Sequence, residues 1–266
     1  MSKKKSKKSK KKSQKKISNR VPIGIKGFDE LVGGGVPKNS SILICGGPGS
    51  GKTIFSLEYL VRGTKNFNQK CLYVTFEQTA DDLREQAKQF GWNLKKLEKE
   101  GKLEIMAFSI EDLSQETIKN IQKKVKKEKI KRLVIDSLST LVINAPIYTN
   151  PSEKAVEDIV ADNVVFSPPV VGDYMVKKFI YRFIEGLRSL DCTTFLVGEA
   201  SQEGNYLSRD TLSEFVCDGV VSITFEALGG EFSRSLIVRK MRQTKNDEDV
   251  HPMEISNKGI IIHKAE

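Results

Sequence analysis

The segment that most constrains the fold is a glycine-rich stretch directly after a short apolar run, Ser41–Cys45. It fits the spacing G-x-x-x-x-G-K-[ST] at every position, with the residues Gly46, Gly47, Pro48, Gly49, Ser50, Gly51, Lys52 and Thr53. Glycines let successive backbone N–H groups point into one concavity, and a helix that starts there adds its partial positive charge. Apolar spacing predicts such a helix over Lys52–Thr64. We therefore predict a buried strand, a phosphate-binding loop and a helix, in this order.

The same motif predicts the ligand of the loop. Lys52 is expected to reach the β- and γ-phosphates of a nucleoside triphosphate, and the Thr53 hydroxyl is expected to ligate Mg²⁺. Asp136 ends the apolar run Leu133–Ile135, where an acid that holds the metal or its water is expected. The sequence therefore predicts a site for ATP and Mg²⁺.

Apolar strand-like runs alternate with amphipathic segments along most of the chain. Strands are predicted at Cys71–Phe76, Leu103–Ala107, Arg132–Ile135 and Thr193–Val197, and helices at Thr79–Phe90, Ile110–Lys129 and Tyr174–Leu190. This alternation predicts an α/β fold with a mostly parallel central sheet that helices flank on both faces. Closely spaced strands then predict a C-terminal antiparallel extension of the same sheet, at Val220–Phe225, Leu236–Met241, Met253–Ile255 and Ile260–His263.

The positive charge of the chain is concentrated at its N-terminus. Residues 1–20 hold ten Lys and Arg20 without an acid, so the remainder has 44 − 11 = 33 basic residues against 34 acidic ones. A Lys- and Ser-rich segment buries little surface, so we predict a disordered tail over 1–19 and one folded domain over 20–264. The tail is either a solvated arm or an electrostatic arm for non-specific binding of nucleic acid.

Several classes of protein are not expected. No apolar run approaches the ~20 residues that cross a bilayer, and no secretory signal follows the N-terminal lysines, so we expect a cytoplasmic protein without membrane association. The four cysteines lack metal-ligand spacing and there are two histidines, which disfavours a zinc site or a histidine-based triad. Between Val142 and Gly172 the prolines predict a long loop, with a short helix at Glu153–Val160.

Taken together, these motifs resemble the KaiC family within the RecA superfamily of P-loop ATPases, over residues 18–264. The resemblance is closest to archaeal single-domain KaiC-like proteins. Besides the phosphate-binding loop and Asp136, it rests on Gly27–Leu31, Gly33–Pro37, Val74–Glu77, Phe90–Trp92, Phe232–Arg234 and Lys240–Arg242.

The resemblance implies roles for four further residues. Glu77 matches the carboxylate that activates the attacking water, although Gln78 stands where the clock protein of the family has a second glutamate. Lys240 and Arg242 match residues that reach the γ-phosphate of a neighbouring subunit, and Arg234 matches an interfacial residue at the nucleotide. These roles imply a homo-oligomeric ring, with a hexamer expected. The alternatives are a carboxylate that caps the next helix and a solvated basic sheet edge.

Two functions remain open at the level of sequence. The first is an ATP-hydrolysing switch that regulates an unidentified partner protein. The second is a DNA-associated paralogue of RecA and RadA, which the acidic composition of the 143–172 loop disfavours. Autokinase activity is not expected, because Glu214 and Phe215 stand where the clock protein has its phosphorylated Ser-Thr pair.

The motif gives a direct test of ligand binding. Lys52 is the one side-chain cation of the Gly46–Thr53 stretch, so Lys52→Ala is expected to abolish detectable ATP binding. Equilibrium binding of a fluorescent ATP analogue measures this. Affinity within a few-fold of the unsubstituted protein would refute Gly46–Thr53 as the nucleotide site.

Overall fold

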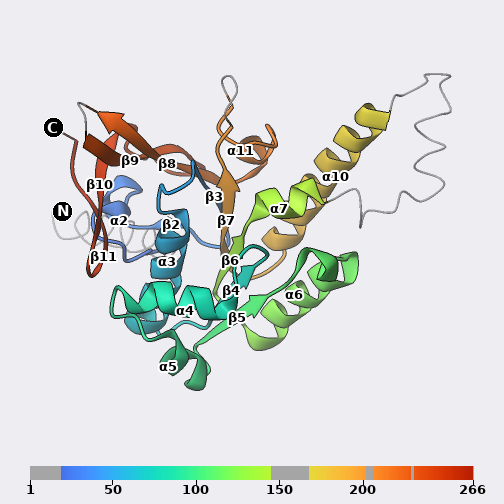
Figure 1. Ribbon diagram of the computed structural model, residues 1–266, viewed down its shortest axis with the longest axis horizontal. Helices are drawn as coiled ribbons and strands as arrows, with labels where there is room; N and C mark the ends of the chain where they lie inside the picture. The colour runs from blue at the N-terminus through green and yellow to red at the C-terminus, as the bar shows by residue number, and fades with distance from the viewer. Residues whose placement is uncertain (1–18, 145–167, 202–205, 229–230, 266) are drawn as a thin grey trace, which may run out of the picture.

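The computed structural model describes residues 19–144, 168–201, 206–228 and 231–265. Their largest sheet has nine strands in the order β11-β10-β9-β8-β3-β7-β6-β4-β5 (Figure 1). Neighbours from β8 to β5 are parallel. These six strands are β3 (Ser41–Gly46), β4 (Cys71–Thr75), β5 (Leu103–Ala107), β6 (Arg132–Asp136), β7 (Thr193–Glu199) and β8 (Gly219–Leu228). The predicted parallel sheet is thereby confirmed.

Three antiparallel strands extend the sheet beyond β8, namely β9 (Glu231–Met241), β10 (His251–Ser256) and β11 (Gly259–Ile262). The prediction was wrong for the first strand of the proposed extension. Val220–Phe225 lies in β8, which pairs in parallel with β3 and antiparallel with β9. The tight connection to β9 is visible in the sequence, whereas the pairing with β3 depends on a contact between distant segments. A separate two-stranded sheet joins β1 (Arg20–Val21) to β2 (Val36–Pro37).

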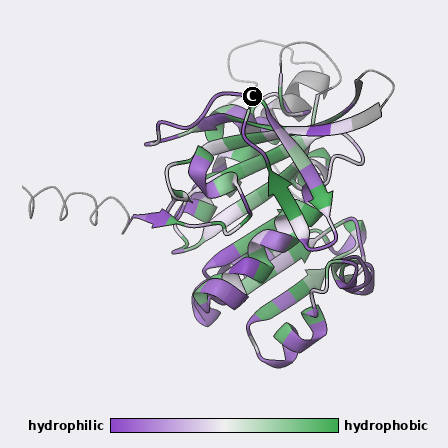
Figure 2. Ribbon diagram, turned by 90° about the vertical axis from the view of Figure 1, so that its left-hand side faces the viewer, coloured by the Kyte–Doolittle hydropathy of each residue, from purple (hydrophilic) through white to green (hydrophobic). Residues whose placement is uncertain are grey.

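Helices cover both faces of the large sheet, and each face has its own hydrophobic core. One core includes apolar side chains of α2 (Phe28–Leu31), α3 (Lys52–Phe67), α4 (Ala80–Lys88) and α5 (Leu94–Lys99). The other includes side chains of α6 (Gln115–Glu128), α7 (Leu138–Ile143), α10 (Pro168–Arg188) and α11 (Ser213–Val216). Figure 2 shows hydrophobic residues concentrated along the strands and hydrophilic residues on the outer turns of the helices.

Local capping explains where the helices differ from the prediction. Thr79 caps α4 in a reciprocal capping box with Asp82, so the helix begins at Ala80. The predicted helix Ile110–Lys129 is two elements, a 3₁₀ turn η1 (Ile110–Asp112) and α6, which the Ser114 hydroxyl caps. Helix α5 was missed, although the carboxamide of Asn93 is a recognisable N-cap that accepts from Lys96 N at 2.9 Å.

Some expectations concern residues outside the described ranges. The tail lies there except for Asn19, and so does the predicted helix Glu153–Val160. Both ends of the predicted 142–172 loop are helical, because α7 extends to Ile143 and α10 begins at Pro168.

A buried arginine joins the N-terminal segment to the core. Arg132, at the start of β6, is fully buried, and its guanidinium stacks on the Tyr59 ring at 4.7 Å. It donates to the carbonyl oxygens of Pro22 at 2.6 Å, Tyr59 at 2.9 Å and Ile23 at 3.2 Å, and to Gln69 Oε1 at 2.6 Å. One side chain therefore satisfies backbone acceptors from two separate segments.

A buried glutamate ties α3 to the last hairpin of the chain. Glu58 is fully buried and pairs with Arg62 at 2.7 Å. Its second oxygen accepts from the backbone N–H of Ile260 at 2.7 Å, and Gly259 leaves room for the carboxylate because a Cβ there would lie 2.6 Å from it. Burial raises the pKa of Glu58, and these donors oppose the rise. The helix that follows the phosphate-binding loop is thus bonded to the β10–β11 turn.

Arg132→Met should be strongly destabilising. It leaves buried carbonyl oxygens without their donor, at about 1–3 kcal/mol each, so the free energy of unfolding should fall by at least about 3 kcal/mol. Chemical denaturation measures the change in midpoint. Arg239→Met, at an exposed position of β9, is the matched control and should shift the midpoint little. Equal shifts for the two variants would contradict the structural role of Arg132.

Candidate functional site

The carboxyl ends of the parallel strands bring the candidate residues together. In the register of the sheet Gly46 lies opposite Glu199, and Thr75 lies opposite Asp136. Polar residues thus continue the sheet face that α3 covers, at the point where its apolar strands end. This edge of an open α/β sheet is where ligands bind in such folds.

The glycine-rich segment forms a loop between β3 and α3. Lys52 Nζ donates to the carbonyl oxygens of Gly46 and Gly47, each at 2.8 Å. Burial lowers the pKa of Lys52, and the nearby carboxylates, Asp136 first among them, oppose that shift. A Cβ at Gly46 would lie 2.3 Å from the carbonyl oxygen of Ile223 in β8, so the close approach of β8 requires glycine. Gly51 has φ +102°, which also favours glycine.

The two residues predicted to hold the metal are in contact. The Thr53 hydroxyl donates to Asp136 Oδ2 at 3.3 Å, although the two residues lie on different elements. Asp136 is 3% exposed, and burial raises its pKa to about 6. A hydroxyl and a carboxylate side by side are the oxygen donors that Mg²⁺ prefers, so this pair fits the ion.

A third residue of this cluster was missed by the sequence analysis. The hydroxyl of Tyr73, which is fully buried in β4, donates to the same oxygen of Asp136 at 2.5 Å. The signal in the sequence is a tyrosine two residues before Thr75, and so on the same strand face. Its partner follows from the β4–β6 register, which the sequence does not contain. From β4, Tyr73 therefore fixes the orientation of the Asp136 carboxylate.

Glu77 follows β4 and stands exposed beside this cluster. Its Oε1 accepts from the hydroxyls of Ser137 and of Thr140, the latter at 2.7 Å. Ser137 is the N-cap of α7 and Thr140 lies in its first turn, so the start of α7 orients this carboxylate. Gln78 turns toward α4, where its Oε1 accepts from Gln86 Nε2 at 2.9 Å. The two side chains are therefore held by different elements.

Arg234 lies against the phosphate-binding loop of its own chain. Its Nη2 donates to the carbonyl oxygen of Gly49 at 3.1 Å, and its guanidinium stacks 4.0 Å from the centre of the Phe225 ring. Strand pairing explains the position, because Arg234 in β9 is opposite Phe225 at the same end of the sheet as the loop. The resemblance alone did not indicate this contact within one chain.

Lys240 and Arg242 lie at the other end of the sheet, level with the amino ends of the parallel strands. Lys240 Nζ and Arg242 Nη2 donate to the carbonyl oxygen of Phe215, at 2.9 and 3.2 Å, and Arg242 Nη1 pairs with Asp218 at 3.0 Å. Burial lowers the pKa of Lys240, as does the adjacent Arg242. Backbone bonds through Asp218 set Arg242 level with Ser41, the first residue of β3. At ~3.3 Å per residue this is about 16 Å along the strand from Gly46.

Glu214 and Phe215, which stand where the clock protein has its phosphorylated Ser-Thr pair, have structural roles in this chain. Glu214 is buried, and its carboxylate accepts from the backbone N–H groups of Leu207 and Ser208, at 2.8 and 2.6 Å. Phe215 is 58% exposed and supplies the carbonyl that both cations share. Glu214 is thus a structural acceptor.

With the loop, the acid and the sheet order in place, similarity to known proteins becomes informative. A family model described as the ATPase KaiC matches residues 21–150 and 145–266. The chain belongs to the KaiC family of ATPases. Membership of this family implies nucleotide binding.

Relatives within the KaiC family include both short and long proteins. A UPF0273 protein of Thermotoga maritima is 31% identical, over 93% of this chain and 97% of its own length. The circadian clock oscillator protein KaiC of Prochlorococcus marinus is also 31% identical, and this chain spans 45% of its length. The crystal structure of a KaiC-like protein from Pyrococcus horikoshii superposes with a TM-score of 0.74 at 31% identity, covering 92% of this chain and 99% of that one.

None of the helices in the described part of the chain combines the length and apolar character that crossing a bilayer requires.

Tyr73→Phe tests the support of Asp136. The substitution keeps the ring and removes the one hydroxyl that donates to Asp136 from behind, so Mg²⁺-dependent ATP affinity or turnover should fall about 10–100-fold. Titration of ATP at several Mg²⁺ concentrations measures the loss. Tyr59→Phe is the matched control, because it removes a buried hydroxyl that donates to the Thr193 carbonyl away from the site. Equal losses would show that Tyr73 acts through stability alone.

Proposed function

We propose that this KaiC-family protein is a Mg²⁺-dependent ATPase whose site is completed by a neighbouring copy in a ring, with a hexamer expected. The observation that carries the proposal is the separation of the basic residues. Lys240 and Arg242 lie about 16 Å along β3 from the phosphate-binding loop of their own chain. Side chains on that edge can contact a phosphate only when another molecule presents it.

Within one chain, the remaining groups are arranged for phosphoryl transfer. Lys52 and the loop N–H groups would bind the phosphates, and Thr53 and Asp136 would hold Mg²⁺, which neutralises charge on the phosphate oxygens. Glu77 would accept the proton of the attacking water, while Ser137 and Thr140 keep its carboxylate in place. Since Gln78 cannot act as a base, one carboxylate carries this role, and we expect slow hydrolysis.

The trans role of Lys240 and Arg242 is supported by how they are held. Both donate to the Phe215 carbonyl and so project to the same side, Lys240 from the end of β9 and Arg242 from the residue that directly follows this strand. The Arg242 guanidinium bonds to Asp218 and to the Phe215 carbonyl, yet the side chain remains 45% exposed, which leaves part of it accessible to a neighbour. A cation supplied in trans stabilises the charge that develops on the transferred phosphoryl group.

We further propose that the ring is a switch that controls an unidentified partner protein in the cytoplasm. One strand supports this, because β9 holds Arg234 against the phosphate-binding loop, carries Lys240 near its other end and is directly followed by Arg242. A change at the Gly49 carbonyl can therefore reach the residues assigned to the next site through a single paired strand.

Mixing two inactive variants tests the shared site. Arg242→Ala keeps its own loop and Glu77, while Glu77→Gln keeps its own basic strand. Each variant alone should lose about 10²-fold or more of the ATPase rate, consistent with the loss of a base or of a finger cation. In mixed rings some sites pair an intact Glu77 with a neighbour's intact Arg242, so phosphate release should partly recover.

Sizing and crosslinking establish that the rings contain both subunits. Glu77→Gln mixed with Lys52→Ala, which leaves no site complete in loop and base, is the control and should not recover. Absence of recovery in proven mixed rings would overturn the trans assignment.

A further inference from the structure

A lysine-lined groove crosses the turn between α4 and α5. Two adjoining hollows of about 660 and 510 Å³ share Gly91, Asn93 and Lys96, so they form one continuous groove. Six lysines line it, and Glu100 is its one acidic residue within the described part of the chain. The lysines are Lys65, Lys88, Lys95, Lys96, Lys99 and Lys102.

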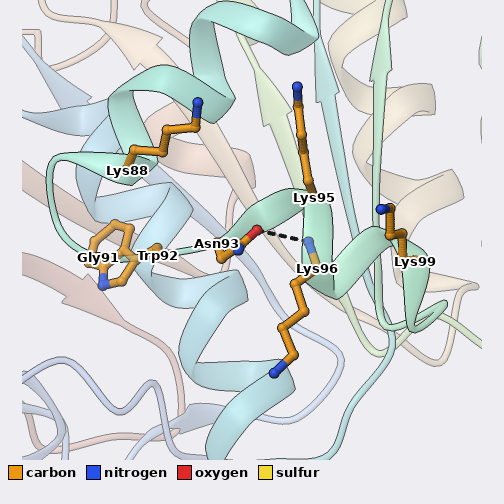
Figure 3. Close-up of a pocket in the computed structure, with 7 residues that line it drawn as sticks. All are labelled: Lys88, Gly91, Trp92, Asn93, Lys95, Lys96 and Lys99. Atoms are coloured by element: carbon orange, nitrogen blue, oxygen red, sulfur yellow. Dashed lines mark hydrogen bonds between the residues drawn. The ribbon is translucent and has the colours of Figure 1, made fainter.

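The backbone of the turn fixes the direction of these lysines. Gly91 has φ +69°, and the N–H groups of Gly91 and Trp92 bond to the last turn of α4 at 2.9 and 3.0 Å. Figure 3 shows the amines of Lys88 and Lys95 on one side of this turn and that of Lys96 on the other. Positive charge therefore flanks the groove along its length.

Neighbouring carboxylates do not balance this charge. Lys88 pairs with Glu85 at 2.6 Å, and Glu100 is shared by Lys102 at 2.9 Å and Lys96 at 4.0 Å. In the described ranges neither Lys95 nor Lys99 forms an ion pair, although they lie one turn apart on α5. Like charges at this spacing destabilise a helix slightly, so the arrangement does not serve the stability of α5.

The surroundings of the groove define its partner. Trp92 stacks on Phe90 at 4.8 Å and is 4% exposed, and Leu97 is buried, so neither can anchor a protein partner or stack on a base. What remains accessible is a row of flexible point charges, which suits phosphates without reading sequence. We propose that this groove binds the phosphate backbone of nucleic acid non-specifically.

This groove is separate from the nucleotide site. Lys65 lies near the end of α3, 13 residues after Lys52 at its start, so the two sites are about 20 Å apart along the helix. Binding there leaves the Gly46–Thr53 loop open. None of the lysines that line the groove belongs to the Lys-rich tail.

A paired substitution in the full chain tests the groove. Lys95→Ala with Lys99→Ala removes two phosphate contacts, so the negative slope of log K against log salt for duplex DNA should become shallower by roughly 1.8. Fluorescence anisotropy of a labelled mixed-sequence duplex over a salt series measures it. Lys123→Ala with Lys127→Ala, an exposed pair at the same spacing on α6, changes net charge equally and should leave the slope nearly unchanged.

Two further arms sharpen the test. Lys95→Arg with Lys99→Arg keeps the charge and should keep the slope, and the basal ATPase rate should be the same in all variants. An unchanged slope in the groove pair, or equal falls in both Ala pairs, would overturn the proposal. The proposal would also be overturned if the Lys95→Ala, Lys99→Ala variant lost binding to anionic phosphatidylserine vesicles and kept its DNA binding, because the polyanion would then be a lipid surface.

Discussion

The register between β4 and β6 is the constraint on which the candidate site depends. It sets Thr75 opposite Asp136, and it brings Tyr73 and Asp136 to the sheet face that α3 covers. A slip of one residue would turn Asp136 to the other face, away from Thr53, and would leave a buried carboxylate among apolar side chains. The apolar residues that specify this register, Leu72 and Val74 on one face and Val134 on the other, therefore specify the metal-holding pair as well.

With this register, the two ends of the parallel strands differ in their chemistry. The phosphate-binding loop, Asp136 and Glu77 lie at the carboxyl ends of the parallel strands, where hydroxyl groups donate to both carboxylates and orient them. At the amino ends lie cations, with Lys240 and Arg242 at the end of β9 and the lysine groove beyond α5 at the other side of the sheet. The chain is nearly neutral outside its tail, so its function depends on where charge is placed.

Local sequence was sufficient for the features whose chemistry lies in one segment. The loop at Gly46–Thr53, the alternation of strands and helices, and Asp136 at a strand end all follow from spacing and composition. Features made by pairing of distant segments could not be predicted. The contact of Arg234 with its own loop depends on the β8–β9 register, and the buried Arg132 reads in the sequence as an ordinary surface arginine. The parallel pairing of β8 with β3 was missed for the same reason, whereas its antiparallel pairing with β9 agrees with the prediction.

The bond between Glu58 and Ile260 has a consequence for the order in which the protein matures. Its partners are 202 residues apart in the sequence, and Glu58 is fully buried in the folded chain. During synthesis α3 emerges first, yet the backbone N–H that its carboxylate requires belongs to β11, which emerges about 200 residues later. The helix that begins at the phosphate-binding loop therefore reaches its final packing only after the hairpin of β10 and β11 has been made, and a truncated chain lacking that hairpin keeps an incompletely satisfied acid in its core.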